Sequence, residues 1–141
     1  MNSDAMNDSI VRTLPALTPL NTPFWTAGRD DRLSILRCRA CGAWLHPPAP
    51  VCPDCLGRDL ASQPVSGLGV IETYTVNHQP WSPGAIVPYV IAIVSLAENP
   101  NVRLTTSIVG VTPEDVAIGM QVRVVFSRHE DVWIPLFTPV K

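Results

Sequence analysis

From residue 68 onward, short apolar and β-branched segments alternate with turn residues. Five of these segments are bounded by glycine, proline or polar clusters, which is the pattern of short β-strands rather than of helices. The second segment is almost wholly apolar, which predicts a strand buried on both faces. The five predicted strands are 68–76, 89–96, 102–109, 121–127 and 132–137.

A short helical turn is predicted between the third and fourth strands. The sequence there is Thr112-Pro-Glu-Asp, in which Thr112 can cap a turn and Pro113 suits its first position. Five strands with one helical turn favour a small closed barrel, because closure removes the exposed edges of a sheet. The fold class predicted for the chain is therefore mainly β.

The first third of the chain lacks this alternation. Residues 1–20 have no clean apolar period and contain Pro15 and Pro19, so we expect a flexible arm or an arm that docks on another subunit. Residues 21–33 predict an N-terminal helical segment, with Asn21 or Thr22 as cap and Pro23 in the first turn. Its aromatic pair Phe24-Trp25, together with Leu33, would pack inward, whereas Gly28 weakens the helix.

Two close cysteine pairs lie in the next segment. The first pair is Cys38-Arg-Ala-Cys41, followed by Gly42, and the second is Cys52-Pro-Asp-Cys55, with ten residues between Cys41 and Cys52. Two residues between cysteines let a tight turn direct both sulfurs at one ion, and two such turns supply four thiolates at about 2.3 Å from Zn²⁺. Four protein ligands leave no position for water or substrate, so the predicted Zn²⁺ site is structural.

Alternatives to zinc remain open at this point. Two disulfides or free thiols are one, although paired Cys-x-x-Cys units in a chain without a secretory signal favour metal in a reducing compartment. Iron is another, because it also accepts four thiolates. The predicted domains are a flexible arm (1–20), the helical segment (21–33), a zinc ribbon (34–62) and a barrel domain (63–141).

Composition narrows the choice of partners. Proline makes up 15 of 141 residues, which favours turns and short strands over long helices. Charged residues are only 16%, against about 25% on average, as expected for a surface that is partly covered by a partner. We expect a cytoplasmic protein, because the first 20 residues lack a signal-peptide pattern and no apolar run reaches about 18 residues.

No complete catalytic set is visible in the sequence. His46, His78 and His129 are best interpreted as loop or turn histidines, since none has a second titrating group at a meaningful spacing. An apolar, proline-rich segment around residues 79–89 contains Trp81, Ile86 and Tyr89. These three residues are candidates for a ligand groove or a partner surface, the alternative being simple packing on the barrel.

The cysteine motif and its flanks resemble the acyl-CoA-associated zinc-ribbon/OB-fold family, long catalogued as a domain of unknown function. The resemblance covers about residues 22–139. It is carried by Phe24-Trp25, Arg37 to Gly42, Pro47-Pro48, Val51 to Cys55, Ser66 to Gly69, Tyr74 to Val76, Pro88 to Val90, Gly119 to Val124 and Trp133 to Phe137.

The resemblance implies an N-terminal helical segment, a rubredoxin-like zinc ribbon and a C-terminal OB fold. It also implies a non-catalytic accessory subunit of a thiolase-like enzyme, an aldolase or a MaoC-like hydratase, with some contribution to acyl-CoA binding. Catalytic residues would reside in the partner, so only the four cysteines carry over as site residues. The chain departs from the family in its N-terminal arm and in a longer loop at 79–87.

The main alternative is a nucleic-acid-binding zinc-ribbon/OB module. The net charge of −2 argues against it, because such binders need clustered positive charge. Residues 60–141 contain four basic side chains and six acidic ones. A rubredoxin-like electron carrier, which would need iron, and a free-standing thioesterase or hydratase are further alternatives.

Overall fold

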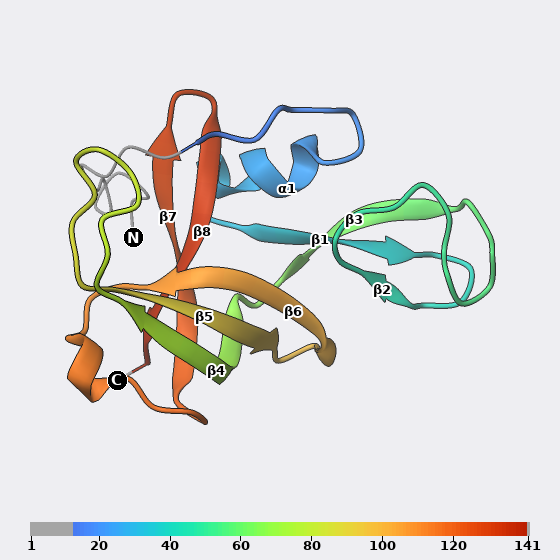
Figure 1. Ribbon diagram of the computed structural model, residues 1–141. Coiled ribbons are helices and arrows are strands. Elements are labelled where there is room, and N and C mark those ends of the chain that lie inside the picture. The colour runs from blue at the N-terminus through green and yellow to red at the C-terminus, as the bar shows by residue number, and fades with distance from the viewer. Residues whose placement is uncertain (1–12, 141) are drawn as a thin grey trace.

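The computed structural model describes residues 13–140 and contains two sheets (Figure 1). The smaller sheet has the order β2-β1-β3, with both pairs antiparallel. The larger sheet is a closed barrel in the order β4-β5-β6-β8-β7, with β7 returning to pair with β4. The predicted mainly β fold, with a ribbon followed by a five-stranded barrel, is therefore confirmed.

The strands and helices have the following bounds. The ribbon consists of β1 (Leu33–Cys38), β2 (Trp44–Leu45) and β3 (Leu60–Val65). The barrel consists of β4 (Leu68–Asn77), β5 (Tyr89–Leu96), β6 (Asn99–Ile108), β7 (Gln121–His129) and β8 (Val132–Pro139). Three short helices complete the fold: α1 (Thr22–Thr26), η2 (Ala27–Asp30) and η3 (Pro113–Asp115).

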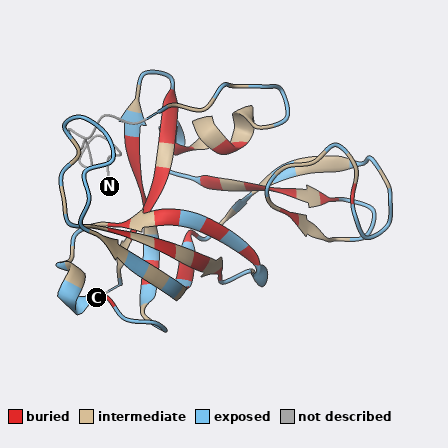
Figure 2. Ribbon diagram, in the orientation of Figure 1, coloured by how far each residue is buried: buried red, intermediate tan, exposed pale blue. Residues whose placement is uncertain are grey.

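Alternating burial along the strands builds the barrel core. Along β5, buried and half-buried positions alternate through the whole strand, and Figure 2 shows buried segments on every barrel strand. The pattern agrees with a strand that has neighbours on both sides and little contact with water on either face. Phe126 and Phe137 are the largest of the fully buried side chains in this core.

The barrel closes weakly between β6 and β8. These strands run parallel and share a single register pair, Ile108 with Phe137. Closer to the middle of β6, the Thr106 hydroxyl donates a hydrogen bond of 3.0 Å to the carbonyl of Pro135. This side-chain bond adds to the backbone bond from the Val109 N–H to the Phe137 carbonyl, at a seam where Pro135 has no N–H of its own to donate.

Strand β1 belongs to two cores at once. Leu33 and Ile35 are buried in the main core with the barrel residues and Phe24. Leu36 and Cys38 lie on the opposite face of the strand and form a separate small core with Leu45 and Cys52. Because side chains alternate across a strand, one six-residue segment holds the ribbon against the barrel.

The predicted helical segment at 21–33 is shorter than expected. Helix α1 ends at Thr26, η2 ends at Asp30, and Leu33 is already the first residue of β1. The Asn21 side chain does not cap α1; its Oδ1 instead accepts a 2.7 Å hydrogen bond from the Thr18 N–H. Gly28 is buried, and a Cβ built there would lie 2.4 Å from Cβ of Trp133, so the tight turn is set by close packing on the barrel.

Strand β3 was not predicted. Its sequence contains Pro64 and lacks strong β-formers, yet it pairs with β1 at six consecutive positions. Proline is tolerated at the edge of a sheet, and β3 has β1 on one side only. Among residues 13–140, the structure contains no helix with the length and apolar character needed to span a bilayer.

We expect Gly28→Ala to lower the free energy of unfolding by about 1–3 kcal/mol, because its methyl group would overlap Trp133 and the Phe126 ring. Chemical denaturation followed by fluorescence measures the change. Asp30→Ala, exposed in the same turn, is the matched control and should shift stability by less than about 0.5 kcal/mol. Equal effects of the two substitutions would contradict the packing explanation.

Candidate metal centre

The first cysteine pair is held by a tight turn at the end of β1. The Gly42 N–H donates to the Cys38 carbonyl at 2.9 Å, and the Cys38 N–H donates to the Ala43 carbonyl at 2.8 Å. Gly42 has a φ of +82°, which a glycine adopts without steric cost. This turn brings the sulfurs of Cys38 and Cys41 to the same side of the chain.

The second cysteine pair repeats these hydrogen bonds. The Leu56 N–H donates to the Cys52 carbonyl at 2.9 Å, and the Cys52 N–H donates to the Gly57 carbonyl at 2.9 Å. Leu56 therefore occupies the place that Gly42 has in the first turn, and its φ of +62° also lies in the left-handed region. The two turns have the same backbone geometry despite their different sequences.

The four cysteine sulfurs lie close together in space. All four Sγ atoms lie within 4.8 Å of one another, and the Cys38–Cys55 and Cys41–Cys52 separations are both 3.6 Å. A tetrahedron with metal–sulfur bonds of about 2.3 Å has edges of about 3.8 Å, so the sulfur arrangement fits a four-thiolate ion. All four cysteines are free, and the separations far exceed a disulfide bond of about 2.05 Å.

Backbone N–H groups act on the pKa values of the Cys38 and Cys41 thiols, with opposite net results. Hydrogen bonding from the Cys41 N–H lowers the pKa of Cys38 to about 7, against opposition from burial. The Ala43 N–H acts in the same direction on Cys41, but the neighbouring thiols and burial outweigh it and raise the pKa of Cys41 to about 12. A bound divalent ion would overcome the raised pKa of Cys41, because coordination deprotonates the thiols outright.

His46, between the two turns, is neither solvent-facing nor a carbonyl cap. Its ring packs 4.8 Å from the ring of Phe24, centroid to centroid. The Nδ1 atom is buried and has no hydrogen-bond partner among residues 13–140. Burial lowers the pKa of this imidazole, so His46 remains neutral at physiological pH.

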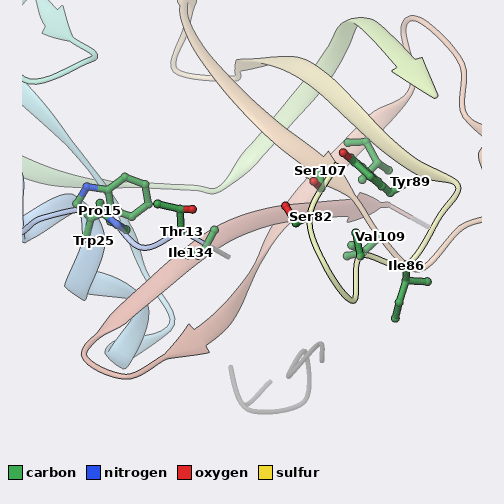
Figure 3. Close-up of a pocket in the computed structure, with 11 residues that line it drawn as sticks. Thr13, Pro15, Trp25, Ser82, Ile86, Tyr89, Ser107, Val109 and Ile134 are labelled. Carbon is green, nitrogen blue, oxygen red and sulfur yellow. The ribbon is translucent and has the colours of Figure 1, made fainter. Parts of the chain in front are cut away.

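The three apolar candidates of the 79–89 segment lie apart from the metal centre, at the barrel. Ile86 and Tyr89 line a cavity of about 410 Å³, whereas Trp81 is exposed and outside its lining. Figure 3 places Trp25, Pro15 and Thr13 on one side of this cavity and Tyr89, Val109 and Ile86 on the other. Asn77 fixes the loop, because it hydrogen-bonds both the Tyr89 hydroxyl and the indole N–H of Trp81.

A second cavity adjoins the first one. It has a volume of about 570 Å³ and shares Trp25 and Ile134 with the first cavity. His46, Pro47 and Pro48 form part of its wall. Sequence patterns do not identify Trp25 or Ile134 as cavity residues, because they are more than a hundred positions apart and only the folded barrel brings them together.

Family models match the chain over most of its length. Residues 25–61 match the rubredoxin-like zinc ribbon domain of ChsH2, and residues 62–127 match the C-terminal OB-fold domain of ChsH2. A DUF35 domain-containing scaffold protein of Methanocaldococcus jannaschii is 42% identical over 98 residues, which is 68% of each chain. The zinc ribbon domain and the OB-fold domain of this family thus lie next to each other in the chain.

Two further relatives carry names of enzyme assemblies. A probable enoyl-CoA hydratase alpha subunit of Thermomonospora curvata is 36% identical over 130 residues, which is 92% of this chain but 40% of that protein. A solved chain from a structure named Ltp2-ChsH2(DUF35) aldolase is 36% identical, with a TM-score of 0.81. That match covers 89% of this chain and 98% of the solved chain.

We expect Cys52→Ser to abolish stoichiometric metal binding while leaving the barrel folded, because the ribbon core and the barrel core are separate clusters. Elemental analysis measures the metal, and hydrogen exchange measures protection residue by residue. Protection should be lost around 38–57 and retained in β5 and β7. Chelation of the metal from the unaltered protein should give the same exchange pattern, and global unfolding in either experiment would contradict the separation of the two cores.

The buried imidazole of His46 predicts a pH dependence of stability. Because burial disfavours its charged form, the unfolded chain binds more protons than the folded one once the pH falls below about 6.5, and stability decreases there. Urea denaturation at pH 7.5 and 5.5 should show a smaller decrease for His46→Leu than for the unaltered protein. His78→Leu, at an exposed position, should retain the full decrease.

Proposed function

Because the chain belongs to the ChsH2 family of zinc-ribbon and OB-fold proteins, we propose that it is a non-catalytic accessory subunit of an acyl-CoA-processing enzyme. The enzyme subunit would be thiolase-like or a MaoC-like hydratase. Relatives named as a hydratase alpha subunit, as a scaffold protein and as part of an aldolase support this assignment. We place its activity in the cytoplasm, where the four thiols stay reduced.

The convergence of four cysteine sulfurs is the observation that carries the proposal. Four cysteine sulfurs converge on one point and supply every ligand that a tetrahedral ion requires. Such an ion has no position for a substrate or an activated water. The histidines of the described residues also lie apart in different settings. His46 is packed on Phe24, and His78 is exposed on a loop. His129 hydrogen-bonds the hydroxyl of Ser127, which is fully buried and so inaccessible to a substrate.

We propose Zn²⁺ as the ion and a structural role for it. The match to a zinc ribbon domain supports zinc, and the four thiolates are suited to it. Iron in the same site would make the protein red, whereas zinc leaves it colourless. Elemental analysis of protein purified without refolding separates the two metals, with one zinc per chain as the expected result.

The apolar surface beside the first cavity is the proposed contact with the enzyme subunit. Trp81 and Ile86 are 74% and 56% exposed, which is unusual for large apolar side chains so close together in sequence. Tyr89 joins them to the cavity, whose lining is mostly apolar. The cavity could admit the acyl part of a thioester, which is the proposed contribution to acyl-CoA binding.

The proposal is tested by co-expression of the chain with thiolase-like and MaoC-like proteins encoded beside it. We expect one of them to co-purify in a fixed stoichiometry and to gain turnover of its acyl-CoA substrate when the chain is present. The chain alone should show no turnover. A monodisperse chain that neither binds nor activates any of these enzymes would refute the proposal, and turnover by the isolated chain would assign it catalysis instead.

The contact surface is tested by Trp81→Ala, which should weaken the complex about 30-fold or more, because buried tryptophans dominate interface energies. Titration calorimetry with the co-purified enzyme measures the affinity. Ile118→Ala, at an exposed apolar position on a different loop, is the matched control and should leave the affinity unchanged. Neither substitution should alter the melting temperature by more than a few degrees, since both side chains are mainly in solvent.

A further inference from the structure

The two cysteine turns differ in one respect: a guanidinium group contacts only the first. The Arg37 Nε donates a 3.0 Å hydrogen bond to the carbonyl of Gly42. Its guanidinium also lies 4.4 Å from the centroid of the Trp44 ring, and its Nη1 lies 3.4 Å from Oε1 of Gln63. Arg37 therefore touches all three strands of the ribbon and the turn that follows Cys41.

The peptide group that Arg37 contacts also lies next to a cysteine sulfur. The Gly42 carbonyl and the Ala43 N–H belong to the same peptide unit, which directly follows Cys41, and the Ala43 N–H is the backbone group that acts most strongly on the pKa of the Cys41 thiol. A positive donor on the carbonyl pulls electron density away from the N–H of the same unit. The N–H then becomes a stronger donor to a thiolate, because hydrogen bonds in a chain polarise one another.

The second turn provides an internal comparison. There the Gly57 N–H donates to the Cys55 sulfur at 3.4 Å, in the position that Ala43 has in the first turn. Among the described residues, no side chain donates to the Leu56 carbonyl, the counterpart of the Gly42 carbonyl. The corresponding peptide unit is thus present in both turns, with an arginine bonded to its carbonyl in the first turn only.

We propose that Arg37 is a positioning residue for the metal ion: it holds and polarises the Gly42–Ala43 peptide that supports the Cys41 thiolate. Arg37 points to the face of β1 opposite the sulfurs and does not itself contact them. Its effect on the ion passes through one peptide unit. Partners of this kind, outside the ligand set, typically change metal affinity by about 10–100-fold when they are removed.

Arg39 is the matched control for charge. It lies between Cys38 and Cys41 in the sequence, closer to the ion along the chain than Arg37. Its side chain nevertheless points to solvent, where it is 61% exposed and pairs with Asp59 at 3.2 Å. Arg37, which lies outside the Cys-x-x-Cys unit, should therefore affect metal binding more than Arg39 does.

The experiment is a metal titration of the full chain and of three variants, Arg37→Gln, Arg37→Lys and Arg39→Gln. Co²⁺ is the probe, its thiolate charge-transfer band is the signal, and Zn²⁺ competition gives the affinity. We expect Arg37→Gln to bind about 10–100-fold more weakly than the unaltered chain, with a displaced charge-transfer band. Arg37→Lys should lie between the two, and Arg39→Gln should remain within about threefold of the unaltered chain.

Amide chemical shifts separate positioning from general destabilisation. In the metal-loaded protein, Arg37→Gln should move the Ala43 amide resonance and leave that of Gly57 in place, since only the first turn loses its donor. Arg37→Lys provides the same measurement if the glutamine variant fails to fold. Unchanged affinity and Ala43 shift in the Arg37 variants, or equal losses for Arg37→Gln and Arg39→Gln, would overturn the proposal.

Discussion

The structure depends on the alternation of side chains along one strand. β1 directs Leu33 and Ile35 into the barrel core, and it directs Leu36 and Cys38 into the small ribbon core. A shift of one residue in its register with β3 would exchange the two faces and move Cys38 away from the other sulfurs. The position of the metal centre relative to the barrel is therefore fixed by strand pairing, before any ion binds.

The second constraint is that neither the metal centre nor the barrel interior has room for a ligand. The metal centre has four ligands from the chain itself, and the barrel interior is filled by Phe126, Phe137 and their neighbours. What remains open lies between the units, where α1, the 79–89 loop and the β6–β8 seam leave two adjoining cavities. Under the proposed function, this open junction is the part of the molecule that contacts other molecules.

Sequence patterns predicted the elements whose signals are local. The two Cys-x-x-Cys units predicted four sulfurs that the structure brings together, and apolar and β-branched runs bounded by turn residues located the five barrel strands to within a few residues. The helical segment was predicted too long. The chain turns at Gly28 because it packs closely on Trp133, which is distant in the sequence. Strand β3 was missed because its pairing with β1, and not its composition, makes it a strand.

The cavities and the burial of His46 could not be predicted from sequence patterns, and the physical reason is the same. Each is produced by residues that meet only after the barrel has closed, such as Trp25 beside Ile134 and Phe24 beside His46. The loop that contains His46 begins and ends at metal ligands, with Cys41 before it and Cys52 after it. A bound ion would therefore limit the freedom of a loop that forms one wall of the second cavity, and this cavity adjoins the one beside the proposed contact surface.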